Sequence, residues 1–306
     1  MNILIVGLGS IARKHIKSVN SLKINAKFYA LRSKPNSLKE NKVNNIYSLS
    51  ELLIKPDFAI ISNPTSYHEK TIMKLINLKV PLFIEKPVLN NYQNASKISS
   101  LIKKNQILTY VACNMRFHPS IIFLKSFIDN FKPIINEINV YSGSYLPSWR
   151  ENKNFRNSYS SSIKMGGGVH LDLIHEIDYC RWIFGDPKEV NSIKRSVSSL
   201  KINSIDFAKY TLLYDKFSLN LSLNYYRKDS KREIELVANN DTIIIDLLNN
   251  KVLSKINNKV LFEGKYSIQD TYNKQMKYFI SKINNKEHPV NSFDEGVKTL
   301  ILALNE

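Results

Sequence analysis

A short glycine-containing segment near the start of the chain has the spacing of a pyrophosphate-binding loop. Residues 7–12 read G-L-G-S-I-A, which matches the pattern G-x-G-x-x-G/A, between an apolar run over 3–6 and a predicted helix over 10–21. In that context the first glycine permits a tight turn, and the second lets the backbone approach a pyrophosphate at the helix N-terminus. The segment predicts dinucleotide binding, and the alternative is a tight strand–helix turn without a ligand. The predicted cofactor contacts in it are Gly7, Gly9, Ser10, Ile11 and Ala12.

The end of the second predicted strand bears on which dinucleotide is bound. Enzymes that use NAD usually carry an Asp or Glu there, which binds the hydroxyls of the adenosine ribose. This sequence has Arg32 and Ser33 instead, and the first carboxylate after the strand is Glu40. Arg32 and Ser33 are suited to a 2′-phosphate, although Arg32 could also stack on the adenine or point to solvent. We therefore expect NADP as the cofactor, with NAD as the alternative.

A predicted helix over residues 168–184 carries ionisable side chains that could do acid–base chemistry. Asp172, His175 and Asp178 are three residues apart, so they lie on one side of the helix. A histidine titrates near neutral pH and can take up the proton of a hydroxyl group. The same side includes Trp182 and a leucine, a mixture that indicates a cleft wall; the alternative is a solvated polar face.

The elements expected around these residues divide into two domains. Strands and helices alternate up to about residue 115, which indicates α/β architecture with right-handed crossovers and a doubly wound parallel sheet of the Rossmann type. The predicted strands there are 3–6, 26–31, 58–61, 81–84 and 108–112, and the predicted helices are 10–21, 66–78 and 92–104. We predict a dinucleotide-binding domain over 1–115 and an α+β domain over 116–306 for substrate binding and dimerisation.

The second predicted domain has consecutive strands with short turns, which is typical of a large, mostly antiparallel sheet. The predicted strands are 138–145, 189–197, 206–214, 218–226, 233–238 and 241–247, and the predicted helices are 120–130, 168–184, 272–283 and 293–304. In the run 219–225, Asn220, Ser222 and Asn224 alternate with apolar residues, so one face of the sheet is polar but uncharged. Because depletion of charge marks interface cores, we expect a homodimer or homotetramer paired through that face.

Three further segments share their residue types with one family of oxidoreductases. They are Ser62-Asn63-Pro64-Thr65 with His68, then Phe83-Ile84-Glu85-Lys86-Pro87, and the stretch 166–178, in which three glycines precede Asp172 and His175. Together they resemble the Gfo/Idh/MocA oxidoreductases, the group that contains glucose–fructose oxidoreductase and inositol dehydrogenase. The resemblance covers essentially the whole chain. It implies NAD or NADP as cofactor, and oxidation or reduction of a sugar at a hydroxyl carbon.

The resemblance also implies roles for individual residues. Lys86 would lie between nicotinamide and substrate and hydrogen-bond the reacting oxygen, with its backbone fixed by Pro87 through a cis peptide. A lysine beside the positively charged nicotinamide would have a lowered proton affinity and could donate to that oxygen. Asp172 would hold a substrate hydroxyl, and His175 would be the general acid/base. The cofactor site would include Asn63, Pro64, His68, Glu85 and Lys86.

One spacing departs from the family pattern. In most members the Asp and the His are four residues apart, whereas Asp172 and His175 are three apart. Either the helix begins differently or Asp172 is displaced. His175 keeps its spacing to Asp178, and Asp178 or Glu176 could orient the imidazole.

Arginine and aromatic residues before the site helix favour an anionic substrate. Arg116 lies where the chain crosses between the predicted domains, and its planar guanidinium suits a carboxylate or a phosphate. We predict that a negatively charged sugar is bound by Arg116, Trp149, Arg156 and Tyr159, with Arg150 nearby. The alternative is ordinary loop packing. The arrangement resembles family members found with surface-glycan and nonulosonic-acid sugar genes.

The composition excludes several classes of protein. Lys and Arg number 44 against 26 Asp and Glu, a net charge of +18, yet the densest basic cluster, 227–232, is short and interrupted by Asp229. We therefore expect no nucleic-acid binding, although the positive field would attract an anionic substrate. Two cysteines, Cys113 and Cys180, exclude a disulfide scaffold and a zinc ribbon, and no metal site is expected.

The compartment is also predicted from the sequence. The two cysteines fit a reducing environment. No apolar stretch approaches the roughly 18 residues of a membrane span, and no signal peptide precedes the first apolar run. We expect a cytoplasmic protein without membrane contact.

A different class of function is a redox-inactive sensor that binds a dinucleotide and a partner through the same fold. Lys86 and His175 together argue against it, because a sensor has no need of both.

Overall fold

The computed structural model describes residues 1–34, 40–150 and 154–305. They form two compact units, Met1–Asn114 with Ile268–Leu300, and Met115–Ser267 with the residues from Ile301 onward. The sequence places 268–300 in the second domain, whereas these residues cluster with the first unit. Within the described residues, no helix is long and apolar enough to cross a membrane.

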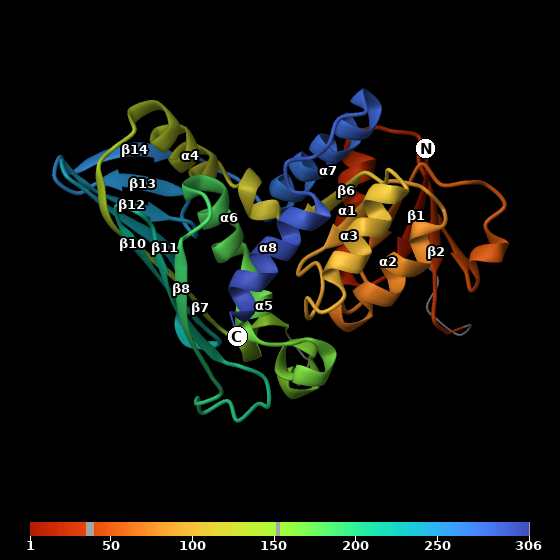
Figure 1. Cartoon of the computed structure of the whole chain (residues 1–306), viewed down its shortest axis with the longest axis horizontal. Helices are drawn as coiled ribbons and strands as arrows, with labels where there is room; N and C mark the ends of the chain where they lie inside the picture. Colours follow the sequence, from red (N-terminus) through yellow and green to blue (C-terminus); the bar gives the residue numbers. More distant parts are fainter. Residues whose placement is uncertain (35–39, 151–153, 306) are drawn as a thin grey trace. The chain divides into compact units, whose positions relative to one another are not determined.

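The first unit is built on a six-stranded parallel sheet with the strand order β3-β2-β1-β4-β5-β6. Figure 1 labels β1, β2 and β6 of this sheet. The strands are β1 Asn2–Val6, β2 Lys27–Leu31, β3 Val43–Ile46, β4 Phe58–Ile61, β5 Leu82–Glu85 and β6 Thr109–Ala112. Every residue of β4, β5 and β6 is buried, as expected for strands covered on both faces. The predicted Rossmann-type sheet is confirmed. The strand order reverses between β1 and β4, which is where sheets of this kind bind ligands.

Helices cover this sheet, and one of them comes from the C-terminal part of the chain. The helices are α1 Ser10–Ser21, α2 His68–Ile76, α3 Ala95–Lys104 and α7 Ile268–Asn285, while α8 Phe293–Leu304 spans the division between the units. Gln269 of α7 donates from Nε2 to Ser18 Oγ at 2.9 Å, which ties α7 to α1. The ring of Phe279, also in α7, packs 5.2 Å from the ring of Phe83 in β5. Helix α7 therefore belongs to the core of the first unit.

The second unit contains an eight-stranded sheet with the order β14-β13-β12-β11-β7-β10-β9-β8. Strand β10 is parallel to β7, and the other neighbours are antiparallel. The strands are β7 Ile135–Tyr145, β8 Glu189–Arg195, β9 Phe207–Leu213, β10 Ser218–Asn224, β11 Tyr226–Ala238, β12 Thr242–Asp246, β13 Lys251–Ser254 and β14 Lys259–Glu263. The helices of this unit are α4 Pro119–Phe131, α5 Val169–Asp172 and α6 Ile174–Phe184. The predicted mostly antiparallel sheet is confirmed.

Some elements differ from the prediction. The sequence does not predict β3, β13 or β14, because each has only four or five residues and no long apolar run. The single helix predicted over 168–184 is two helices, since Leu173 has φ −97° and ψ 29° between α5 and α6. The segment between β7 and α5 holds short 3₁₀ turns within its described residues. The break at Leu173 lies between Asp172 and His175, where the spacing departs from the family pattern.

The two faces of the second sheet differ along β10. Leu219, Leu221 and Leu223 are fully buried, whereas Asn220 and Ser222 on the opposite face are half-buried. The strands on either side of β10 add charges to that opposite face. Asn220 Nδ2 donates to Glu137 of β7 at 3.1 Å, and Ser222 lies opposite Lys209 of β9. The expected depletion of charge therefore holds for β10 and not for its neighbours.

We expect a homodimer that pairs through this polar face. The double substitution Asn220→Lys and Ser222→Lys should dissociate it, because a two-fold interface places like charges beside their symmetry mates. Light scattering measures the mass of the starting protein and of the variant. The matched pair Asn220→Ala and Ser222→Ala adds no charge and should remain dimeric. A starting protein that is already monomeric at micromolar concentration contradicts the expectation.

Candidate active site

The turn between β1 and α1 can accept a phosphate group. Gly7 has φ +88°, and a Cβ there would lie 2.6 Å from backbone atoms of Asn63, so the position requires glycine. A Cβ on Gly9 would meet no atom within 4 Å, so there is open space at the start of α1. No side chain of the described residues caps α1. Its first backbone N–H groups are therefore available to an anion, and this turn fits the pyrophosphate of a dinucleotide.

The end of β2 carries the residues expected to select the cofactor. Arg32 is half-buried, with Nη1 3.5 Å from Asn45 Oδ1, and Ser33 is exposed. Glu40 accepts a hydrogen bond from Arg13 Nε at 2.7 Å. The first carboxylate after β2, that of Glu40, is thus paired with Arg13. The residues directly after β2 are Arg32 and Ser33, which offer a basic group and a hydroxyl group.

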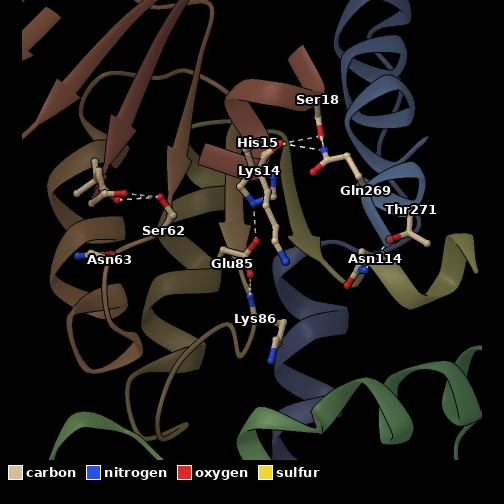
Figure 2. Close-up of polar contacts among 12 residues, drawn as sticks. Lys14, His15, Ser18, Ser62, Asn63, Glu85, Lys86, Asn114, Gln269 and Thr271 are labelled. Atoms are coloured by element: carbon tan, nitrogen blue, oxygen red, sulfur yellow. Dashed lines mark hydrogen bonds and ion pairs between the residues drawn. The ribbon is translucent and has the colours of Figure 1, made fainter. Parts of the chain in front are cut away.

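The loop after β4 lies against the glycine turn (Figure 2). Ser62 donates from Oγ to the Gly7 carbonyl oxygen at 2.8 Å, and Asn63 donates from Nδ2 to Thr71 Oγ1 at 2.8 Å. Pro64 follows and precedes a short 3₁₀ turn. The two loops at the switch point of the sheet are thus joined by hydrogen bonds.

His68 joins the loops that follow β4 and β5. Its Nε2 lies 3.0 Å from the carbonyl oxygen of Asn63, and its Nδ1 lies 3.0 Å from that of Pro87. Burial lowers the pKa of His68, although these carbonyl oxygens act in the opposite direction. The side chain is 1% exposed, and its contacts to both carbonyl oxygens hold the two loops together.

Lys86 follows β5 at the carboxyl edge of the sheet (Figure 2). Its backbone N–H donates to Oε2 of Glu85 at 3.2 Å, and the peptide to Pro87 is cis, as the resemblance implies. The other carboxylate oxygen of Glu85, Oε1, is 2.6 Å from Nε2 of the buried His15. The backbone of Lys86 is therefore attached to an ionisable pair inside the unit.

In the second unit, two tyrosines hold the carboxylate of Asp172. Tyr225 donates from its hydroxyl to Oδ2 at 2.5 Å, and Tyr159 donates to Oδ1. Burial, and then the charge of Asp172, raise the pKa of Tyr225 well above its usual value. The sequence predicts Tyr159 as a site residue and misses Tyr225. The available signal is that a tyrosine hydroxyl at the buried end of a strand needs a hydrogen-bond partner.

The groups expected to orient His175 have other partners. Arg116 donates from Nε and Nη2 to the two oxygens of Asp178, each at 2.8 Å, and Arg232 donates from Nε to Glu176 Oε1 at 2.6 Å. Asp178 is 1% exposed and Glu176 is fully buried. These ion pairs anchor α6, which places the 9%-exposed His175 in its first turn. Asp178 and Glu176 thus each pair with an arginine, and their role in orienting the imidazole stays a prediction.

Arg116 itself is predicted to bind a substrate anion. Its guanidinium is buried, is bidentate to Asp178, and lies 5.5 Å from the ring of Trp182. A substrate anion would therefore compete with the Asp178 carboxylate for the Arg116 guanidinium.

The loop before α5 encloses a cavity of about 250 Å³. Its lining residues are Leu146, Trp149, Arg150, Asn154, Phe155, Asn157, Ser158 and Ser160. The Trp149 ring packs edge-on against Tyr225 at 5.3 Å, so the cavity adjoins the tyrosines that hold Asp172. Arg156 donates to the Leu200 carbonyl oxygen at 3.2 Å and does not line this cavity. The structure brings Trp149, Tyr159 and Asp172 together, and turns Arg156 toward another loop.

Known proteins resemble both the first unit and the whole chain. Residues 1–113 match the Gfo/Idh/MocA family, described as an oxidoreductase family with an NAD-binding Rossmann fold. The resemblance to the Gfo/Idh/MocA oxidoreductases is confirmed. A myo-inositol 2-dehydrogenase of Thermotoga maritima is 23% identical over 99% of this chain and 94% of its own length.

Solved structures share the fold of the whole chain. A UDP-N-acetylglucosamine 3-dehydrogenase from Acidithiobacillus ferrooxidans has a TM-score of 0.81 at 17% identity, covering 100% of this chain and 96% of its own. A levoglucosan dehydrogenase in complex with NADH has a TM-score of 0.86 at 14% identity, covering 99% and 95%. At these identities the likeness establishes the fold.

Proposed function

We propose that this protein is an NAD(P)-dependent oxidoreductase that transfers a hydride between the nicotinamide and a hydroxyl carbon of a sugar, sugar acid or sugar nucleotide. The observation that carries the proposal is Lys86, placed directly after β5 of an NAD-binding Rossmann unit with its backbone N–H bonded to Glu85. A cation at that edge of the sheet lies where Rossmann units act on their ligands. A protein that only bound the dinucleotide would not need it.

Each residue has a proposed task. The bound nicotinamide supplies the hydride-accepting or hydride-donating carbon. Lys86 donates a hydrogen bond to the reacting oxygen and stabilises the charge that develops on it. His175 takes the hydroxyl proton during oxidation and returns it during reduction. Asp172, held by Tyr159 and Tyr225, accepts a hydrogen bond from a neighbouring substrate hydroxyl through its remaining lone pairs.

The substrate class follows from the cavity and from the relatives. Trp149 and Phe155 offer aromatic faces, while Arg150, Asn154 and Asn157 offer donors that suit hydroxyl and anionic groups. The relatives named above are dehydrogenases of inositol, levoglucosan and a UDP-linked amino sugar. We propose a carbohydrate that carries a negative charge, in surface-glycan sugar biosynthesis.

The cofactor is proposed to be NADP, with Arg32 and Ser33 binding its 2′-phosphate. Arg32→Asp should weaken NADP binding more than NAD binding, because a phosphate partner is replaced by a like charge. Titration of the protein fluorescence with each dinucleotide measures both dissociation constants. The control Lys34→Asp makes the same charge change two residues away and should have a smaller effect. A starting protein that prefers NAD contradicts this assignment.

The test of the function is reduction of NAD(P) by a panel of sugars, polyols and sugar nucleotides, followed by nicotinamide absorbance. We expect turnover with at least one anionic carbohydrate. Tight dinucleotide binding without any turnover would instead support the redox-inactive sensor.

A further inference from the structure

A buried hydrogen-bonded pair of the first unit includes one residue, His15, that has no task in the function proposed above. His15 of α1 is fully buried and Glu85 of β5 is 7% exposed, and His15 Nε2 lies 2.6 Å from Glu85 Oε1. The two residues are 70 positions apart in the chain. Burying a carboxylate is costly unless it is hydrogen-bonded, so His15 serves to keep Glu85 inside the unit.

The surroundings of His15 fix its ring and determine which of its nitrogens donates a hydrogen bond. Phe83 and Tyr272 contact the imidazole edge-on, with ring centroids at 4.8 Å and 5.7 Å. Nδ1 has no hydrogen-bond partner among the described residues, whereas Nε2 faces a carboxylate oxygen. A carboxylate oxygen only accepts, so Nε2 carries the proton and donates it to Glu85.

The pair connects the glycine turn to Lys86 (Figure 2). Helix α1 begins at Ser10, next to the open space at Gly9, and carries His15 in its second turn. Gln269 of α7 holds the same helix through Ser18 and the Lys14 carbonyl oxygen. Glu85 receives His15 on Oε1 and the Lys86 N–H on Oε2. One carboxylate thus bridges the phosphate-binding helix and the backbone of the lysine.

We propose that His15 is a positioning residue that acts on Lys86 through Glu85. The inference rests on the proposed function, in which Lys86 hydrogen-bonds the reacting oxygen. With the His15 donor in place, the Glu85 carboxylate keeps one orientation, and that orientation holds the Lys86 N–H. Without the His15 donor the Glu85 carboxylate is free to rotate, and the hydrogen bond from the Lys86 N–H to Glu85 is lost.

The first test separates positioning from cofactor binding. His15→Phe removes the donor and should lower kcat by about ten- to a hundredfold, the scale of a small misplacement of a reacting group. The dissociation constant for the dinucleotide should stay within about threefold of its starting value, because the glycine turn is untouched. His15→Gln places an amide N–H near the former Nε2 and should restore most of kcat. His15→Asn, one methylene shorter, should not.

The second test needs no turnover. Hydrogen exchange followed by mass spectrometry, on the protein without cofactor, reports the peptide that contains Lys86. In His15→Phe its exchange should be roughly five- to tenfold faster, as expected for loss of an ordinary hydrogen bond. If His15→Phe does not fold, the comparison of His15→Gln with His15→Asn decides the same question.

Ser18→Ala is the matched control on the same helix. It removes a part-buried hydrogen bond of α1 without touching Glu85, and should leave kcat and the exchange at Lys86 unchanged. Unchanged kcat and unchanged exchange in His15→Phe, or equal effects in Ser18→Ala, would overturn the proposal. If the starting protein shows no turnover at all, the proposed function fails, while the exchange experiment still decides whether His15 holds Lys86.

Discussion

Lys86→Ala should lower kcat by about two orders of magnitude or more, the usual scale for loss of an acid–base or charge-stabilising group. The Lys86 side chain is the cation placed directly after β5 of the first unit. Its removal leaves the oxyanion that develops on the substrate without a partner. Steady-state turnover by nicotinamide absorbance measures the loss, and fluorescence titration should show that dinucleotide binding is nearly intact.

The control for this variant is Lys97→Ala, which removes an exposed lysine of α3 in the same unit. It changes the net charge equally and should leave turnover unchanged. Turnover of Lys86→Ala like that of the starting protein would remove Lys86 from the mechanism.

His175→Ala should also lose about two orders of magnitude in kcat, because the hydroxyl proton no longer has a base that titrates near neutral pH. The pH profile of kcat/KM is the second measurement. The variant should lose the acidic limb, since that limb reports protonation of the base in the free enzyme. The ion pairs that anchor α6 do not involve the imidazole, so thermal stability should be retained.

His170→Gln is the matched control for this variant. Burial, and then the nearby charge of Lys194, lower the pKa of His170 to about 4, so it is a weak base compared with an ordinary histidine. Its replacement should leave the acidic limb in place. If that limb instead disappears in His170→Gln and stays in His175→Ala, the assignment of the base to His175 is wrong.

Short-range signals in the sequence were enough to predict every strand of the first sheet except β3. The continuous apolar run Ile3–Val6, the glycine turn and the strand–helix alternation each depend on neighbouring residues, and the structure confirms the sheet they predict. The sequence did not predict that α7 lies with the first unit, because Ser18 is 251 residues from its partner Gln269 and Phe83 is 196 residues from its partner Phe279. Local patterns in the sequence do not predict contacts between residues so far apart.

In the candidate site, too, features that depend on neighbouring residues were predicted, and contacts between distant elements were not. Gly7, Lys86 and the cis peptide before Pro87 follow from motifs, and the structure places them at the edge of the sheet. Tyr225 on Asp172, and Asp178 on Arg116, are pairings between elements far apart in sequence. Helical periodicity placed His175 and Asp178 on one side of α6, although Asp172 belongs to α5. It did not identify which charges neutralise each other inside the unit.

The measurement that tests the central claim most directly is transfer of deuterium. The protein is incubated with NADP or NAD and with sugars, polyols and sugar nucleotides deuterated at their hydroxyl-bearing carbons, and the reduced nicotinamide is analysed by mass spectrometry. The account predicts deuterium in the nicotinamide for at least one carbohydrate, and transfer about a hundredfold slower or more with Lys86→Ala. A starting protein that binds the dinucleotide yet transfers deuterium from no carbohydrate would contradict it.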